Sequence, residues 1–113
     1  MGKTIITSGR VFTDIDALAC ALSLGELFAK QNLPAEVVLS GPLNETVIST
    51  IKSWPLTFST RLSSEATGFI LVDLSDPSYF SDWVVQNKII GLYDHHFGFE
   101  KYWREKLGNK AKI

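Results

Sequence analysis

The sequence predicts an α/β fold, a three-layer Rossmann-like domain with a mostly parallel sheet and helices on both faces. Short β-branched or apolar runs alternate along the chain with longer segments whose apolar residues recur at helical spacing. Connections of this length allow crossovers, and crossovers between parallel strands place helices over the faces of the sheet. A chain of 113 residues with 45% apolar residues is the size of one domain and can bury an ordinary core.

The expected strands are short and end in turn residues. The first ends at Ser8-Gly9, the second at Ser40-Gly41-Pro42, and the central one at Asp73. By residue range, the expected strands are 4–7, 36–39, 68–73 and 88–93, with a further short strand around 56–58 in an ambiguous region. The last residues, 110–113, look like the opening of another strand, which predicts that the protein continues beyond them.

Four helices are expected between these strands. The first begins near Thr13 or Asp14, runs to Lys30 and is apolar on most sides, so we expect it to be buried. Asn44 is a good N-cap for a second helix, whose inner face would hold Val47, Ile48, Ile51 and Trp54. A third helix is predicted over 77–86, with Tyr79, Phe80, Trp83 and Val84 facing inward. The fourth is predicted over 99–107, with Gly108 as its C-cap.

Composition narrows the possible functions. The net charge is −1 and no basic patch occurs before the C-terminal end, which argues against nucleic-acid binding by charge alone. No apolar run approaches the roughly 18 residues of a membrane span, and the first residues lead into a strand pattern, which is not typical of a signal peptide. The single cysteine, Cys20, excludes an internal disulfide, so we expect a cytoplasmic protein.

Polar residues follow three of the predicted strands. Ligands of an open parallel sheet bind at the carboxyl ends of its strands. The residues there are Arg10, Asp14 and Asp16 after the first strand, Asp73 after the central strand, and Asp94, His95 and His96 after the next. Carboxylates with imidazoles suit manganese, iron, cobalt or zinc, and close carboxylates repel one another unless a cation lies between them. The pattern therefore predicts a shared metal or phosphate site.

Each piece also has a purely structural interpretation. Asp14 and Asp16 could be caps at a helix start, with Thr13 as the N-cap, and Asp73 could be a turn residue. Phe12 and Phe97 flank the expected crevice and could stack on a base, but we expect Phe97 to pack against the protein. The three groups in combination favour a site over these separate explanations.

Three motifs resemble those of the DHH phosphoesterase superfamily. Thr13-Asp14-Ile15-Asp16-Ala17 resembles its first motif, Val72-Asp73-Leu74-Ser75 its second, and Asp94-His95-His96 its third. The superfamily includes manganese-dependent inorganic pyrophosphatases, exonucleases and small-nucleotide phosphodiesterases. The resemblance spans essentially the whole chain and implies that residues 1–113 are a DHH-type α/β domain, pyrophosphatase-like and N-terminal. A C-terminal substrate-binding domain would then lie beyond Ile113.

The resemblance also implies roles for these residues. Asp14 resembles a ligand of a first metal ion, Asp16 and His95 resemble ligands of a second, and Asp73 resembles the carboxylate that bridges both. His96 resembles the residue that meets the substrate phosphate, and Asp94 the group that orients the histidines. The implied cofactor is one or two Mn²⁺ ions, with Mg²⁺ or Co²⁺ as alternatives.

Arg10 departs from the family pattern, which has a metal-ligating histidine at that position. An arginine has no lone pair to donate, so it cannot replace that ligand. Its guanidinium could instead pair with Asp14 or Asp73, or grip a substrate phosphate. We therefore expect the first metal site to be weak or lost, while Asp16, Asp73 and His95 could still hold one ion.

The resemblance implies a metal-dependent phosphohydrolase that cleaves a phosphoanhydride or phosphodiester, with pyrophosphate as the nearest substrate, through a metal-activated water. His96, Asp94 and Arg10 would be its catalytic residues. The alternative is a catalytically impaired phosphate- or nucleotide-binding regulatory module in which Arg10 replaces the histidine. A plain α/β domain with scattered polar loop residues is a third interpretation. Tyr102 and Trp103 could cover the sheet or form a contact in a homo-oligomer.

Overall fold

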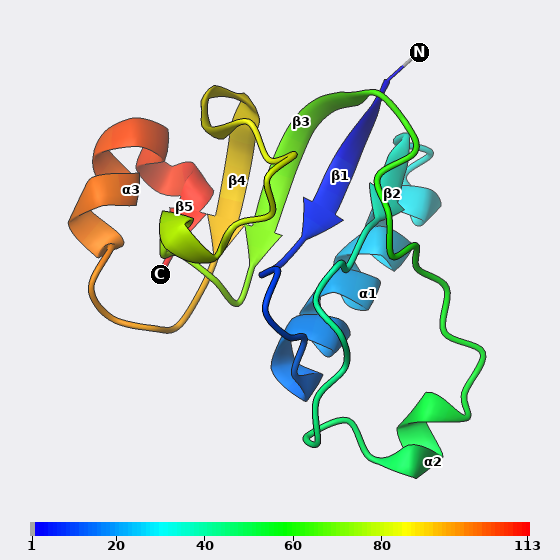
Figure 1. The fold of residues 1–113 in the computed structure, drawn as a ribbon. Coiled ribbons are helices and arrows are strands. Elements are labelled where there is room, and N and C mark those ends of the chain that lie inside the picture. Colours follow the sequence, from blue (N-terminus) through cyan, green and yellow to red (C-terminus); the bar gives the residue numbers. More distant parts are fainter. Residues whose placement is uncertain (1) are drawn as a thin grey trace.

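The chain folds around a five-stranded parallel sheet (Figure 1). A computed structural model describes residues 2–113. The strands are β1 (Lys3–Thr7), β2 (Ala35–Val37), β3 (Ala66–Val72), β4 (Ile89–Tyr93) and β5 (Ala111–Lys112). Their order across the sheet is β2-β1-β3-β4-β5, and every neighbouring pair is parallel. The predicted fold class is confirmed: the structure is an α/β domain of Rossmann-like architecture.

Helices and turns connect the strands. The α-helices are α1 (Ile15–Lys30), α2 (Ser49–Lys52) and α3 (Glu100–Leu107). Three single 3₁₀ turns also occur, η1 (Pro77–Tyr79), η2 (Gln86–Lys88) and η3 (Gly108–Lys110). Among the described residues, no helix is both long and apolar enough to cross a membrane.

The core lies on both faces of the sheet. Successive side chains of a strand point to opposite faces. Ile6 and Val72 therefore pack in one apolar cluster with Leu18 and Ala21 of α1, while Ile5 and Leu71 pack in the other. Trp103 of α3 and Phe80 complete this second cluster, and both are buried. Of the two aromatic side chains on α3, Trp103 thus covers the sheet.

The prediction of a helix over 77–86 is wrong. Only η1 and η2 form there, with irregular backbone between them. Asp76 accepts hydrogen bonds from the Ser78 backbone N–H at 3.0 Å and the Ser78 hydroxyl at 2.8 Å. Such a local turn competes with a continuing helix because the aspartate satisfies the backbone by itself. Of the four residues expected to face inward, Phe80 is buried and Tyr79 is exposed. Trp83 and Val84 are partly buried and pack against the core, as expected.

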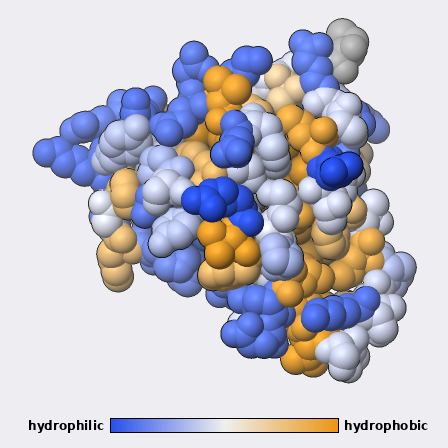
Figure 2. All heavy atoms as spheres, viewed as in Figure 1, coloured by the Kyte–Doolittle hydropathy of each residue, from blue (hydrophilic) through white to orange (hydrophobic). Residues whose placement is uncertain are grey.

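The prediction for the segment after Asn44 is also largely wrong. Asn44 does not cap a helix; its side-chain oxygen accepts hydrogen bonds from the Thr46 backbone N–H and hydroxyl. The helix α2 begins only at Ser49, and Ile48 and Trp54 are exposed. Val47 is buried and Ile51 packs against the core, as expected. Figure 2 shows apolar surface over α2. No strand forms at 56–58; instead Ser59 makes a single parallel bridge to Val38.

The remaining elements match the predictions closely. The helix α1 ends at Lys30, and α3 begins after Phe99 and ends at Gly108, whose φ of 61° lies in the left-handed region. Glycine adopts this conformation without steric penalty, which is why it is favoured at a C-cap. The final strand β5 pairs with β4, so the strand pattern near the C-terminus was interpreted correctly.

Candidate metal centre

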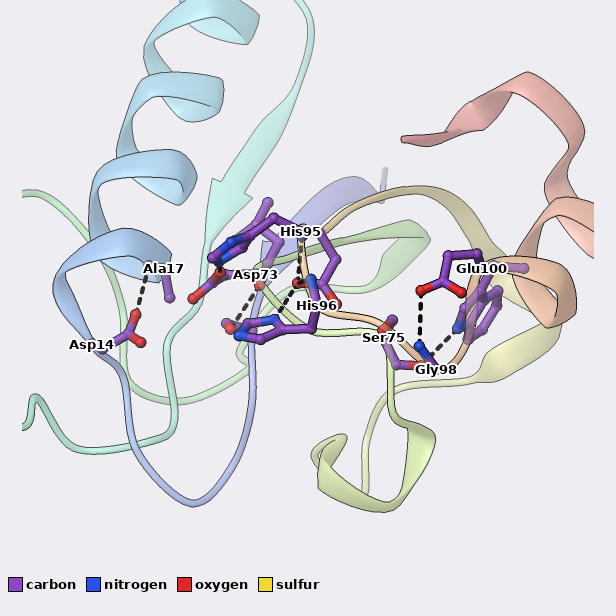
Figure 3. A network of polar contacts seen from close by, with 12 residues as sticks. Asp14, Ala17, Asp73, Ser75, His95, His96, Gly98 and Glu100 are labelled. Atoms are coloured by element: carbon purple, nitrogen blue, oxygen red, sulfur yellow. Dashed lines mark hydrogen bonds and ion pairs between the residues drawn. The ribbon is translucent and has the colours of Figure 1, made fainter. Parts of the chain in front are cut away.

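Three loops meet at the carboxyl edge of the sheet. β1, β3 and β4 are neighbours, so the segments that follow them bring Asp14, Asp73 and Asp94 to one place. Figure 3 shows Asp14 and Asp73 there, together with His95 and His96, which follow Asp94. A cleft of about 400 Å³ opens there. Its lining includes Ser8, Gly9, Val11, Phe12, Asp14, Ala17, Asp73, Leu74, Ser75, Asp76, Tyr79, Asp94, His96, Phe97 and Phe99. The expected position of the site, at the ends of three parallel strands, thus coincides with an actual cleft.

Asp73 occupies the centre of this arrangement. Its φ is 55°, in the left-handed region, where aspartate and asparagine are tolerated better than most residues. The backbone N–H of Asp73 donates to the Tyr93 carbonyl at 2.7 Å, which fixes the turn against the end of β4. The side chain is only 8% exposed, and its Oδ1 lies 2.9 Å from Nε2 of His95.

The carboxyl group of Asp73 is held in an environment that disfavours its charge. Burial is the largest cause and repulsion by the Asp14 carboxylate the next, and together they raise the pKa of Asp73 to about 6, although His96 and His95 act in the opposite direction. A cation between the two carboxylates would remove this repulsion. The electrostatics of Asp73 and Asp14 therefore favour cation binding at this point.

Asp14 caps the first helix and also faces Asp73. Its Oδ1 accepts a hydrogen bond from the Ala17 backbone N–H at 2.9 Å. Thr13, which we had expected as the N-cap, is fully buried instead, and its hydroxyl donates to the Gly41 carbonyl at 2.7 Å. The capping interpretation of Asp14 is thus correct. It does not exclude a second role, because the capping bond uses one carboxylate oxygen.

Asp94 organises the two histidines. Its side chain is fully buried, and its Oδ1 accepts from His96 Nδ1 at 2.5 Å and from the His95 backbone N–H at 2.9 Å. The hydrogen bond with Asp94 is the main cause that raises the pKa of His96 above its ordinary value. With Nδ1 held in this way, Nε2 is the ring nitrogen left for a ligand. Oδ2 of Asp94 is buried and has no hydrogen-bond partner among the described residues.

The possible metal ligands form two groups that share one residue. Asp14, Asp16 and Asp73 form one group, and Asp73, Asp94, His95 and His96 form the other. Within each group, one ligand atom per residue can be chosen such that all lie within 4.8 Å of one another. Carboxylate and imidazole donors at this spacing fit a divalent cation of the first transition row.

The single-ion set proposed from the sequence is not assembled as one group. Asp16 and His95 each lie near Asp73, but in different groups. Asp16 belongs to the start of α1, whereas His95 follows β4 and contacts Asp73 directly. The arrangement therefore offers two adjacent positions with Asp73 between them, rather than one position with all three ligands.

Arg10 does not form the contacts that we considered for it. Its Nη2 donates to the Ser78 carbonyl and its backbone N–H to the Tyr79 carbonyl, both at 3.0 Å. Within residues 2–113, Arg10 has no ion pair with Asp14, Asp73 or any other carboxylate. The cause is the backbone: Gly9 bridges to Phe80, so Arg10 is held beside the 78–79 segment. Arg10 is also not among the residues that line the cleft.

Sequence reasoning placed Phe12 and Phe97 beside the cleft but missed Val11 and Tyr79 in its apolar lining. Val11, Phe12, Tyr79 and Phe97 line it together with the carboxylates. The expectation that Phe97 packs is wrong, because its side chain is 94% exposed. One feature of the sequence indicates this exposure: Phe97 stands between His96 and Gly98, and the three residues before it are polar.

Comparisons with protein-family models, with curated proteins and with solved structures gave no significant match. Function is therefore inferred below from the residues of the cleft, their geometry and the resemblance of three motifs to the DHH phosphoesterase superfamily.

Proposed function

We propose that this chain is a metal-dependent phosphohydrolase of the DHH type that cleaves a phosphoanhydride or phosphodiester. The observation that carries the proposal is Asp73, which stands between two groups of metal-ligating side chains at the carboxyl edge of the sheet. The order and chemistry of the three motifs support the same conclusion.

Two metal positions follow from the two groups. Asp14 and Asp16 would hold one ion, His95 a second, and Asp73 would bridge both. Mn²⁺ is the proposed ion, with Mg²⁺ or Co²⁺ as alternatives, because carboxylate-rich sites prefer the harder ions. When bound, such a pair of ions lowers the pKa of a water molecule and neutralises charge on the phosphoryl oxygens.

His96 has a separate role in this proposal. Asp94 fixes its ring through Nδ1, and the raised pKa of His96 favours the protonated imidazole. A protonated Nε2 directed into the cleft can donate a hydrogen bond to a phosphoryl oxygen and stabilise negative charge as it develops. Inorganic pyrophosphate is the simplest substrate with which to test this function.

One observation favours a second function, that of a phosphate- or nucleotide-binding regulatory module. Arg10 occupies the place of a metal-ligating histidine, and its guanidinium is bound to Ser78 rather than directed into the cleft. The first position then has only carboxylate ligands from the described residues. On this alternative, the cleft binds its ligand without cleaving it.

Thermal unfolding with and without Mn²⁺ tests the metal site. We expect Mn²⁺ to raise Tm of the wild-type chain, because a ligand that binds only the folded state stabilises it. Asp73→Asn should abolish the rise: asparagine tolerates the left-handed backbone of this position but supplies no charge. Asp82→Asn, at an exposed position outside the cleft, is the matched control and should keep the full rise.

An unchanged Tm in the wild-type chain, or the same rise in Asp73→Asn, would refute the metal site. If Mn²⁺ does raise Tm, an assay for hydrolysis of pyrophosphate or of a generic aryl phosphate by the Mn²⁺-loaded chain separates the two functions. Turnover that Asp73→Asn loses favours the enzyme, and a metal-dependent shift in Tm without turnover favours the binding module.

A further inference from the structure

We propose that the ligand of this cleft carries a planar aromatic group beside its phosphate, and that Phe97 is the surface on which this group stacks. The inference rests on the proposed function, because it assumes that the phosphate lies at the metal centre. It adds a specificity-determining residue, Phe97, and the part of the cleft in which the aromatic group would lie.

The first observation is the exposure of three aromatic side chains around one cleft. Phe97 is 94% exposed, Phe12 52% and Tyr79 48%, and all three line the cleft that contains Asp73 and His96. An aromatic side chain exposed to water gains free energy when it is covered by another ring. Three such residues from three separate loops around one cavity indicate a place for an apolar, ring-shaped group.

The second observation is the position of Phe97 relative to the proposed phosphate site. It directly follows His96, whose ring and backbone N–H are both bonded to Oδ1 of Asp94. The next residue, Gly98, has a φ of 123°, and its N–H donates to Oε1 of Glu100 at 2.8 Å, which ties this turn to the start of α3. The backbone on both sides of Phe97 is therefore held in place, so the exposed ring is presented by a defined turn.

The third observation concerns charge. The described residues that line the cleft include Asp14, Asp73, Asp76 and Asp94 but no lysine or arginine. A bare polyanion such as pyrophosphate would depend entirely on the metal ions and His96 for its attraction. A ligand with one phosphate end and one aromatic end matches both parts of the lining.

The size of the cleft agrees with this class of ligand. Sites for small organic molecules have volumes of about 300–1,000 Å³ and are mostly apolar with a few polar groups. The cleft, at about 400 Å³, falls in this range, and its polar groups are concentrated around Asp73. A phosphate group at the metal centre would leave the part beside Phe97 and Tyr79 free for the aromatic group.

Two ligands that differ only in the ring provide the test. Adenosine 5′-monophosphate and ribose 5-phosphate share a sugar and a phosphate, and calorimetric titration of the Mn²⁺-loaded chain measures both without requiring turnover. Removal of an aromatic stacking partner weakens base binding by about five- to 150-fold. We expect adenosine 5′-monophosphate to bind the wild-type chain at least about tenfold more tightly than ribose 5-phosphate.

The variants assign this difference to Phe97. Phe97→Ala should remove most of the difference between the two ligands, and Phe97→Tyr should retain it. Neither change is expected to affect folding, because the ring is exposed. Trp54→Ala is the matched control: Trp54 is 55% exposed but does not line the cleft, so the difference should persist.

Equal affinity for the two ligands, or a Phe97→Ala variant that keeps the preference, would overturn the inference. So would a Mn²⁺-loaded chain that binds neither ligand. Failure of the proposed function has another signature, because Tm would then not respond to Mn²⁺ at all.

Discussion

Among single residues, Asp73 is the one on which the proposed metal site depends most. Its buried carboxyl group faces Asp14 and is held on a left-handed backbone at the end of β3. A non-glycine residue in this conformation costs about 1–2 kcal/mol, and such positions are frequent at functional sites. Asp73 thus lowers the stability of the folded chain when no cation is bound, and its carboxyl group is positioned to bind a cation.

This placement predicts that the stability of the metal-free chain depends on pH. The pKa of Asp73 is about 6 in the folded state, above the ordinary 3.8. Between these values the folded chain holds a proton that the unfolded chain has lost, so stability falls as pH rises from about 4 to about 6. At pH 7 to 8, Asp73→Asn should therefore be more stable than the wild type by about 2 kcal/mol.

Chemical denaturation in the presence of a chelator, from pH 4 to 8, measures this difference. The advantage of Asp73→Asn should shrink towards pH 4, where the wild-type carboxyl group is protonated in the folded state. A difference between wild type and variant that is the same at every pH would contradict the stated environment of Asp73.

The residue types of the site were predictable, but the directions of some side chains were not. Asp14, Asp73 and Asp94 follow strands that are neighbours in the sheet, and the rule that ligands bind at strand ends brings them together. Arg10 and Phe97 depend on their loops. The bridge from Gly9 to Phe80 holds Arg10 beside Ser78, and the turn at Gly98 leaves Phe97 exposed to solvent. Neither feature has a periodic signal in the sequence.

At the scale of elements, the site depends on the packing of two loops. The loop after β1 lies against Gly41, and Thr13 donates to the carbonyl of that glycine. A Cβ atom on Gly41 would lie 2.7 Å from the Gly9 carbonyl oxygen and 2.8 Å from the Phe12 carbonyl carbon. Both atoms belong to the backbone, so the loop that leads to Asp14 could accept a side chain only by moving.

We therefore expect Gly41→Ala to destabilise the chain by about 1–3 kcal/mol and to reduce the rise in Tm that Mn²⁺ causes. Gly9→Ala is the matched control in the facing loop, because a Cβ there would meet its nearest atoms at an ordinary 3.5 Å. Denaturant unfolding with and without Mn²⁺ measures both effects. A Gly41→Ala variant as stable as Gly9→Ala would show that the loops are not packed in this way.

Strong local signals were sufficient to predict some elements. The long apolar pattern of α1 and the glycine stop after α3 gave correct helices. The segment after Asp76 failed because its apolar spacing resembled a helix while its polar residues formed a turn. Spacing alone does not show whether a short polar side chain will bond to its own backbone.

At the scale of the whole molecule, the order of the strands explains the position of the cleft. The chain passes from β1 outward to β2 and then returns to β3 on the other side of β1. The order of the strands therefore reverses between β1 and β3, which is called a topological switch point. The connections on its two sides diverge and leave a crevice, where ligands of open α/β sheets bind. Asp14 follows β1 and Asp73 follows β3, so the proposed bridging position lies at this point.

The sequence predicted parallel strands but not their order, because order depends on contacts between strands that are far apart in the chain. β1 pairs with β3, and 58 residues lie between Thr7 and Ala66. Both edges of the sheet also come from short strands, β2 and β5, whose patterns are too brief to fix a position in the sheet.

The location of the metal ion in a crystal tests whether Asp73 is a metal ligand. Crystals grown or soaked with Mn²⁺ would be examined by anomalous diffraction. We expect at least one anomalous peak about 2.0–2.5 Å from a carboxylate oxygen of Asp73, with further ligands from Asp14 and Asp16 or from His95. A fully loaded crystal with no peak beside Asp73, or with manganese bound only elsewhere, would contradict the proposed metal site.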